Sequence, residues 1–353
     1  MPIYEKDPVF ACACTAYGFK SLFDSIFDPE KYKRVYILKG TCGSGKSALI
    51  RKIARECRER SSEYELFSCS FDPDSFDGII IRSRDTCIVD GTSPHITEPK
   101  YPGAVEIVLN TGKADENALK ERRNEIIDLC KKSSAAFGKS YSFLRASLEL
   151  ENSYNNIITE NFRFDKMFCA IKRFCDRDFV RGTGFIRENR LINVICKDGL
   201  HKSGAFLGRA SKKCLVLDKP GGAYLAMEEI VSTAARYDQP VTVSVSPLDF
   251  EKINGVWLPE LDMAFGIENE CESRDDWYHV FNMARFTDKV TVSRSKNKLR
   301  FLNKCKDKLI LRAADSMAEA YFAHMELESI YNANTDYSVN NILYEKLVKE
   351  IFG

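Results

Sequence analysis

The chain has 353 residues, 44% of them hydrophobic and 29% charged, and a formal net charge of +1. This length allows two domains with cores of their own, and the composition is that of an ordinary globular protein, not of a disordered or fibrous one. No apolar stretch approaches the ~20 residues of a membrane span, and residues 1–10 lack the pattern of a signal peptide. We therefore expect a cytoplasmic protein without a membrane partner.

The cysteine pattern does not predict disulfides. The 13 cysteines are scattered and odd in number, and no Cys-x-x-Cys pair occurs. Cys12 and Cys14 are the only close pair, and alternation along a strand would place both thiols on one face. Buried thiols in a reducing compartment explain this pattern better than a metal or redox role.

Five strand-like runs occur in the first half of the chain, with helical patterns between some of them. They cover residues 9–14, 34–39, 65–71, 86–90 and 104–110. Such alternation predicts an α/β fold in which helices cover both faces of a mainly parallel sheet. In sheets of this kind, ligands bind at the carboxyl ends of the strands.

The strand at 34–39 leads into the sequence Gly-Thr-Cys-Gly-Ser-Gly-Lys-Ser at 40–47, and a helical pattern comes next at 48–58. Glycines allow successive N–H groups to face a phosphate, and the helix N-terminus adds positive potential. We expect Lys46 to reach the β- and γ-phosphates and the Ser47 hydroxyl to bind Mg²⁺. The residues expected to hold the nucleotide are Gly40, Thr41, Cys42, Gly43, Ser44, Gly45, Lys46, Ser47 and Ala48.

Two further segments are candidates for the chemistry. The strand at 86–90 ends in Asp90, which we expect to join Ser47 in the Mg²⁺ shell, although an aspartate there can also simply open a turn. In the polar loop after this strand, His95 and Glu98 join Lys46 as candidate catalytic residues, either to orient an attacking water or to contact the γ-phosphate. The same loop could equally be only a well-capped connection.

A long charged helical region occupies residues 115–175, with breaks expected near Gly138 and Asn161. It is too long for a crossover between strands and indicates a helical subdomain or lid. Its repeated Glu-Leu-Glu segment does not suggest a metal site, because Glu149 and Glu151 are two residues apart and point in different directions on a helix.

An internal repeat organises the chain. Residues 146–155 align with residues 323–332 at an offset of 177, sharing the pattern Ala-x-x-Glu-Leu-Glu-x-x-Tyr-Asn, and the same offset aligns other segments. The sequence therefore predicts a tandem duplication. The first copy is residues 1–179, with a helical subdomain at about 114–176, and the second copy is residues 180–353.

The second copy differs where the phosphate loop would be. After a strand at 214–217, a shorter turn begins at Asp218 and contains no Gly-Lys-Ser, so this copy is expected to have lost nucleotide binding. A weaker anion site at Lys219 is the lesser alternative. The basic residues crowded between 289 and 312 could contact nucleic acid, but with so small a net charge they indicate a solvated helix face.

The motifs at 40–47 and Asp90 resemble those of the P-loop NTPase superfamily. More narrowly, the segments 35–40, 89–95 and 99–103, together with the tandem repeat, resemble a poorly characterised family of bacterial two-lobed P-loop ATPases. That family carries an aspartate where this chain has Glu98. The resemblance covers nearly the whole chain and implies an ATP-binding fold without supplying a substrate.

The sequence favours ATP, because no Asn/Thr-Lys-x-Asp motif for guanine occurs. The leading hypothesis is a slow Mg²⁺-dependent ATPase that acts as a nucleotide switch on an unknown protein or small-molecule partner. A small-molecule kinase with a helical lid is the alternative, and its candidate phosphate-binding arginines are Arg82, Arg84, Arg122, Arg123 and Arg145. A nucleotide-bound scaffold without turnover is a third possibility.

Overall fold

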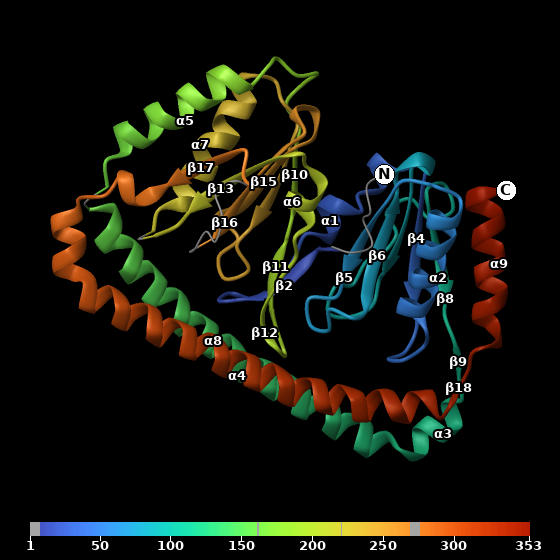
Figure 1. Cartoon of the computed structure of the whole chain (residues 1–353). Coiled ribbons are helices and arrows are strands. Elements are labelled where there is room, and N and C mark those ends of the chain that lie inside the picture. Colours follow the sequence, from blue (N-terminus) through green and yellow to red (C-terminus); the bar gives the residue numbers. More distant parts are fainter. Residues whose placement is uncertain (1–7, 161, 220, 269–275) are drawn as a thin grey trace. The chain divides into compact units, whose positions relative to one another are not determined.

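The computed structural model describes residues 8–160, 162–219, 221–268 and 276–353. These residues form two compact units (Figure 1). Unit 1 is built from the described residues of Met1–Ser142, Val194–His201 and Arg312–Gly353, and unit 2 from those of Phe143–Asn193 and Lys202–Leu311.

The two units do not coincide with the linear halves of the chain. The long helices α4 (Arg123–Thr159) and α8 (Lys289–Asn332) each begin in one unit and end in the other. As a result, α5 (Phe164–Asp178) packs in unit 2 and α9 (Ser338–Phe352) packs in unit 1. The repeat boundary expected between residues 179 and 180 stays a prediction, because a compact unit need not coincide with a repeated sequence.

Unit 1 contains a six-stranded sheet with the strand order β1-β5-β6-β7-β4-β8, in which β6 alone runs antiparallel to the others. Its strands are β1 (Val9–Phe10), β4 (Arg34–Lys39), β5 (Tyr64–Ser68), β6 (Phe76–Ile81), β7 (Thr86–Asp90) and β8 (Glu106–Asn110). Because β4 lies between β7 and β8, the turn after β4 is flanked by two parallel strand ends.

One face of this sheet is covered by α2 (Lys46–Glu59), which α9 joins in the same core. The apolar stripe of α2 buries Ile50 and Ile53 against strand residues such as Leu66, and Leu347 of α9 completes the cluster. Burial of each such side chain stabilises the fold by roughly 1.5–3 kcal/mol. This packing fixes the axis of α2, and with it the direction of the turn that precedes the helix.

The opposite face is covered by the short helix α1 (Phe23–Ile26) and the residue after it. The Phe27 ring lies 5.1 Å from the ring of Phe67. A Cβ at Gly78 would come within 2.6 Å of the Phe27 ring, so only glycine permits this approach. The predicted α/β fold with a mostly parallel sheet is confirmed, whereas helical cover of both faces stays a prediction, because α1 is only four residues long.

The remaining elements are short. Two-stranded pairs are formed by β2 with β3, by β9 with β18 and by β11 with β12. These short elements are β2 (Cys12–Thr15), β3 (Gly18–Ser21), β9 (Lys113–Ala114), β18 (Thr335–Asp336), β11 (Asn193–Cys196), β12 (Gly199–Lys202), α3 (Glu116–Glu121), η1 (Pro29–Lys31) and η2 (Arg82–Arg84).

Unit 2 contains a second six-stranded sheet with the order β10-β14-β15-β16-β13-β17, in which β15 alone is antiparallel. Ile230 of α7 and Ile171 of α5 pack with Phe265 in the core that covers one face of this sheet. The elements are β10 (Arg187–Arg190), β13 (Lys212–Leu217), β14 (Val241–Val245), β15 (Ile253–Leu258), β16 (Met263–Glu268), β17 (His279–Asn282), α6 (Ala205–Arg209), α7 (Ala223–Arg236), η3 (Pro259–Leu261) and η4 (Met283–Arg285).

The two sheets therefore share strand order and strand direction. The likeness extends to backbone conformation at positions 177 residues apart. Asp85 and Asp262 are both left-handed, with φ of 46° and 49°, and Gly45 and Gly222 both precede a helix with φ of 91° and 95°. These pairs lie at the offset on which the predicted duplication rests, and the duplication itself stays a prediction.

Several predicted elements have different limits in the structure. The strands at 34–39 and 86–90 agree with β4 and β7, but the run at 9–14 divides into β1 and β2. The antiparallel strand β6 was not among the five expected strands, because Asp77 and Gly78 interrupt its apolar pattern.

The expected helix break near Gly138 is wrong, because α4 continues through it. The ~1 kcal/mol cost of a helical glycine is small beside the packing of so long a helix. The break near Asn161 falls between α4 and α5, but Asn161 itself lies outside the described residues. Among the residues that the structure describes, no helix has both the length and the apolar character needed to cross a membrane.

Candidate functional site

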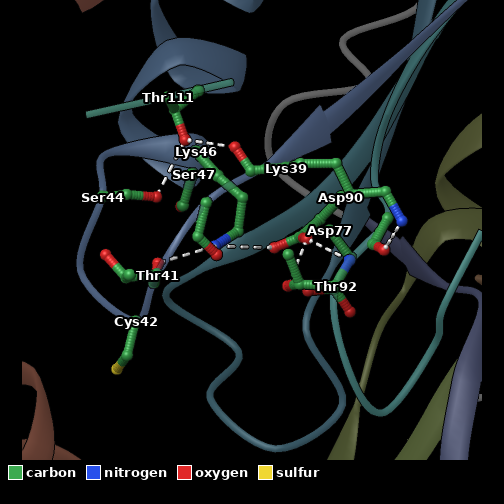
Figure 2. A network of polar contacts seen from close by, with 12 residues as sticks. Lys39, Thr41, Cys42, Ser44, Lys46, Ser47, Asp77, Asp90, Thr92 and Thr111 are labelled. Atoms are coloured by element: carbon green, nitrogen blue, oxygen red, sulfur yellow. Dashed lines mark hydrogen bonds and ion pairs between the residues drawn. The ribbon is translucent and has the colours of Figure 1, made fainter. Parts of the chain in front are cut away.

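The predicted phosphate loop lies at the carboxyl end of β4, and α2 begins at Lys46 (Figure 2). The parallel register pairs Leu38 of β4 with Asp90 of β7, so Asp90 ends its strand beside the start of the loop. The carboxyl ends of β7, β4 and β8 meet at this edge of the sheet. The site therefore occupies the edge where ligands bind in parallel sheets.

The glycines of the loop have separate structural reasons. Gly43 and Gly45 have φ of 68° and 91°, a left-handed conformation that other residues rarely adopt. A Cβ at Gly40 would lie 2.4 Å from Ser44 Oγ and 2.7 Å from the Thr111 carbonyl oxygen. The chain can therefore turn tightly here only with glycine at these positions.

The N-terminus of α2 is open. Its N-cap is Gly45, no side chain caps the helix, and its first turn contains no acidic residue. The first N–H groups of a helix have no partner within the helix, and they carry the positive end of the helix dipole. This arrangement is suited to receiving an anion.

Lys46 folds back over the loop. The residue is only 9% exposed, and its Nζ donates hydrogen bonds to the carbonyl oxygens of Thr41 at 3.0 Å and Gly40 at 3.3 Å. Asp90 Oδ2 lies 3.8 Å from the same ammonium group. The structure thus brings together the two charged residues that the sequence assigned to the phosphates and to the metal (Figure 2).

The two expected Mg²⁺ ligands offer oxygen atoms, which Mg²⁺ prefers. Asp90 Oδ1 accepts hydrogen bonds from the Thr92 N–H at 2.9 Å and the Thr92 hydroxyl at 2.6 Å, which fixes the carboxylate. Ser47 Oγ accepts a hydrogen bond from the Phe76 N–H at 2.9 Å and keeps a second lone pair. Their chemistry fits a hard divalent cation.

His95 lies in a buried position. It is 8% exposed, its ring stacks on Phe23 at 4.4 Å, and its Nε2 lies 3.7 Å from Asp77 Oδ1. Burial opposes protonation of the imidazole, but the negative charges of Asp77 and Asp90 outweigh it, so the pKa of His95 is raised. Among the described atoms, its Nδ1 has no hydrogen-bond partner. These contacts give His95 a place in the core beneath the site.

Asp77 is a buried acid that the sequence analysis did not select. It is 4% exposed within β6, where it contacts His95 and lies 3.8 Å from the Cys12 thiol. The available indication was a single carboxylate in the otherwise apolar run Phe76–Ile81. A buried acid in such a strand requires a partner, and the sequence could not identify which one.

Glu98 and Ala48 lie at the surface. The Glu98 side chain is 70% exposed and forms an ion pair with Lys39 Nζ at 2.6 Å. Lys39 also donates to the Gly91 carbonyl oxygen at 2.8 Å, which ties the loop after β7 to the end of β4. Ala48 is an exposed residue of α2. The contacts of Glu98 are those of a loop anchor.

Residues from the C-terminal part of the chain cover the phosphate loop, which the sequence analysis did not anticipate. The Tyr337 hydroxyl lies 3.0 Å from the Gly43 carbonyl oxygen, and Asn340 Nδ2 donates to the Ser44 carbonyl oxygen at 2.8 Å. In a trans peptide the C=O and the following N–H point in opposite directions. Drawing these carbonyls toward α9 therefore turns the next N–H groups away from it. Because Tyr337 and Asn340 are almost 300 residues from the loop, no local pattern could identify them.

Two of the arginines that a kinase would need lie away from the loop. Arg82 and Arg84 form η2 after the antiparallel strand β6, at the opposite edge of the sheet, and Arg82 pairs with Glu65 at 3.0 Å. Arg122 forms an ion pair with Glu125 at 2.8 Å. The other two candidates are Arg123, whose side chain donates to Asn124, and Arg145, which belongs to unit 2.

The corresponding turn of unit 2 already contains an anion. Asp218 Oδ1 accepts a hydrogen bond from the N–H of Ala223, the first residue of α7, at 2.8 Å. Burial raises the pKa of Asp218 to about 6. A Cβ at Gly222 would lie 2.9 Å from the Phe162 ring, so an aromatic side chain covers this turn closely. The helix N-terminus that an external phosphate would use is filled by the chain's own carboxylate, which leaves the alternative at Lys219 without support.

The basic residues of α8 lie mostly on an exposed face of the helix. Lys296, Arg300, Lys304 and Lys308 occur at every fourth position and are exposed, whereas Lys306 pairs with Glu151 at 3.6 Å. This pattern is that of a solvated helix face, and contact with nucleic acid stays a prediction.

Unit 1 therefore combines an uncapped helix N-terminus, a buried lysine and the hydrogen-bonded oxygen atoms of Asp90 and Ser47 at one sheet edge. No family model, curated protein or solved structure matches this chain.

Proposed function

We propose that unit 1 binds ATP with Mg²⁺ at residues 40–47 and hydrolyses it slowly, as a nucleotide switch. The observation that carries this proposal is the turn between β4 and α2, where left-handed glycines precede an uncapped helix and a buried lysine. Backbone N–H groups, a helix dipole and a mobile ammonium group are the three means by which proteins hold phosphate groups.

The contacts of Lys46 are ones that its ammonium group could give up for a bound phosphate. Its ammonium group contacts two backbone carbonyls and, at the longer distance of 3.8 Å, Asp90. A triphosphate offers Lys46 hydrogen bonds in which donor and acceptor are both charged, and these are stronger than its bonds to neutral carbonyls. Moving Lys46 to the phosphates would free Asp90 to hold Mg²⁺ together with Ser47.

We further propose that the fold is of the P-loop NTPase type, duplicated in tandem. The identical strand orders of the two sheets and the paired left-handed residues at the offset of 177 support a duplication. Under this proposal residues 180–353 are a degenerate copy, and the sheet of that copy lies in unit 2. Its Asp218 substitutes for the phosphate at the N-terminus of α7, and its role is structural or regulatory.

A switch also needs a connection between the nucleotide and a moving part. Tyr337 and Asn340 contact the loop from the segment that begins α9, and Glu328 lies against Gly43 from α8. The helix α8 continues into unit 2. We propose that nucleotide occupancy is read through these contacts and passed along α8 to an unknown protein or small-molecule partner.

A nucleotide-bound protein without turnover is the second candidate. It is favoured by the positions of His95, which is buried against Phe23, and of Glu98, which pairs with Lys39 at the surface. A group that activates water must come within hydrogen-bond reach of it. The kinase hypothesis lacks such an observation, because Arg82 and Arg84 lie at the other edge of the sheet.

The test uses the full chain with Mg²⁺, and measures ATP affinity by calorimetry and phosphate release by a coupled assay. Lys46→Ala should weaken binding by roughly 100-fold or more, because it removes charge-assisted hydrogen bonds of about 1.5–3 kcal/mol each. Lys219→Ala, at the second turn, is the matched control and should leave affinity unchanged. Full affinity in Lys46→Ala would refute the proposal.

Phosphate release then separates the two candidates. Release by the wild type that is lost in Lys46→Ala establishes an ATPase, and retention of that release in His95→Ala assigns His95 a purely structural role. Tight binding without release supports the nucleotide-bound scaffold.

A further inference from the structure

Three side chains with different donor atoms meet beside the phosphate loop. They are Cys42 of the loop and His324 and Glu328 of α8, all within unit 1 and all half-buried. One sulfur, one nitrogen and one oxygen atom from these residues lie within 4.8 Å of one another. None of the three belongs to the proposed Mg²⁺ or lysine contacts.

We propose that Cys42, His324 and Glu328 form a site for a zinc-type divalent cation, which ties the phosphate loop to α8. The proposal does not rest on nucleotide binding.

The separation of the sulfur and nitrogen donors suits tetrahedral coordination. His324 Nε2 lies 3.4 Å from Cys42 Sγ. With Zn–S of about 2.3 Å and Zn–N of about 2.0–2.1 Å, the edge of a tetrahedron between these two atoms is roughly 3.6 Å. A hydrogen bond between the Cys42 thiol and the His324 imidazole also explains the observed separation. A bound cation would replace the proton between these two atoms, which already lie at a suitable distance.

The helix supplies two of the ligands from one face. His324 and Glu328 are four residues apart, a spacing that places both side chains over the same side of α8. Two histidines at this spacing bind zinc in helical metal motifs for the same reason. Cys42 then approaches from the loop, so a bound ion would bridge segments 282 residues apart in sequence.

The donor set selects the metal class. A thiolate and an imidazole are ligands of zinc and its neighbours among the transition metals, whereas Mg²⁺ and Ca²⁺ take oxygen ligands. Three protein ligands leave a fourth position for water or another oxygen atom.

The surrounding structure allows the approach of α8. A Cβ at Gly43 would lie 2.8 Å from Glu328 Cγ and 2.1 Å from Asn332 Oδ1. Glycine at this position therefore allows α8 to lie close to the loop, in addition to allowing the left-handed turn. The Phe71 ring meets the His324 ring edge-on at a centroid distance of 6.1 Å. These contacts hold the ligands in place before a cation arrives, which reduces the ordering required for binding.

The experiment uses the full chain, freed of metal by a chelator, and Co²⁺ as a spectroscopic probe for Zn²⁺. We expect one Co²⁺ per chain, with the thiolate charge-transfer absorption and the intense visible bands of a tetrahedral site. Cys42→Ser should remove the charge-transfer band, and His324→Ala and Glu328→Gln should weaken Zn²⁺ binding by more than about 100-fold in competition with a chromophoric chelator.

Two cysteines provide matched controls. Cys130 of α4 and Cys305 of α8 are also free thiols, and replacing either with serine should leave the cobalt spectrum unchanged. Absence of the band in the wild type, or its persistence in Cys42→Ser, would overturn the proposal. Since no nucleotide is added, these outcomes are independent of ATP binding. Circular dichroism of each variant distinguishes lost coordination from lost folding.

Discussion

The turn after β4 in unit 1 and the turn after β13 in unit 2 occupy the same place in sheets of the same strand order, yet they differ in charge. Each precedes a helix through a left-handed glycine, Gly45 or Gly222. The first leaves the helix N-terminus open beside Lys46, whereas the second fills it with the carboxylate of Asp218. The same backbone geometry therefore stands beside a lysine in one turn and beside a carboxylate in the other.

The side chains that cover the two turns also differ in polarity. At the first turn, Tyr337 and Asn340 bind the carbonyl oxygens of the loop. At the second, Tyr154 and Ile158 lie against Gly221, and Phe162 lies against Gly222. A polar cover can accommodate charged phosphates and water, whereas an apolar cover excludes both.

The repeated acidic segment contributes to both covers. Glu328 lies beside Cys42 and His324, whereas Glu151, at the equivalent position, pairs with Lys252 at 3.3 Å and with Lys306. The Glu151 carboxylate is therefore neutralised by lysines in unit 2, whereas the Glu328 carboxylate remains available to a cation in unit 1.

The largest effect is expected for a substitution in β6, the strand of unit 1 that occupies the same place as β15 of unit 2. Asp77→Ala should cost unit 1 about 3 kcal/mol, because it removes one member of a buried pair with His95. Asn254 stands at the equivalent position of β15, and Asn254→Ala should cost less than about 1 kcal/mol. Hydrogen exchange of the β6 and β7 peptides, with the β15 and β16 peptides as internal reference, measures both. Equal losses in the two sheets would contradict this difference.

Asp218→Asn should stabilise unit 2 at neutral pH by at most about 3 kcal/mol. Burial raises the pKa of Asp218 to about 6, above the ~3.9 of an unfolded chain. The contribution of this group to stability is therefore complete below pH ~3.9 and is lost as the pH rises through about 6. Asparagine cannot ionise but can still accept the hydrogen bond from Ala223.

The measurement is urea unfolding monitored by tryptophan fluorescence, because Trp257 and Trp277 both belong to unit 2. The gain should be present at pH 7 and absent near pH 4. A gain of the same size at both values would show that ionisation of Asp218 is not the cause.

Gly45 and Gly222 precede α2 and α7, and the same substitution at each separates stability from ATP binding. Gly45→Ala and Gly222→Ala should each cost about 1–2 kcal/mol, since both residues are left-handed. Only Gly45→Ala should also weaken ATP binding, because its Cβ would lie 2.5 Å from Asn340 Nδ2. Thermal unfolding and calorimetry test the two effects. Loss of ATP affinity in Gly222→Ala would place nucleotide in unit 2.

The smallest expected effect concerns the cover of the loop. Tyr337→Phe removes a hydroxyl within reach of the Gly43 carbonyl oxygen, which should cost about 0.5–1.5 kcal/mol and lower ATP affinity by up to about tenfold. Tyr154→Phe, at the second turn, should leave affinity unchanged. If Tyr337→Phe binds ATP as the wild type does, the hydroxyl does not position the loop.

Local patterns predicted local structure well. The limits of β4 and β7, the position of the loop and the start of α2 were predictable from apolar runs, glycines and a lysine that lie within a few residues of one another. β6 was missed because Asp77 interrupts its apolar pattern and meets its partner His95 only in the folded core. The role of Asn340 was beyond prediction for the same reason, since its contact with Ser44 depends on the path of the whole chain.

Helix α9 packs in unit 1 although it follows the strands of unit 2 in the chain, and this affects the order in which the protein can fold during synthesis. Unit 1 takes Leu347 and Ile351 of α9 into its core, although its sheet is made by residues before 111. During synthesis the strands of the first sheet are therefore made long before α9, which completes their core. The loop at 40–47 can acquire its cover only after residue 340 has left the ribosome. A chain synthesised only through β8 would thus lack the part of this core that α9 supplies, and the site is covered only after α9 has been made.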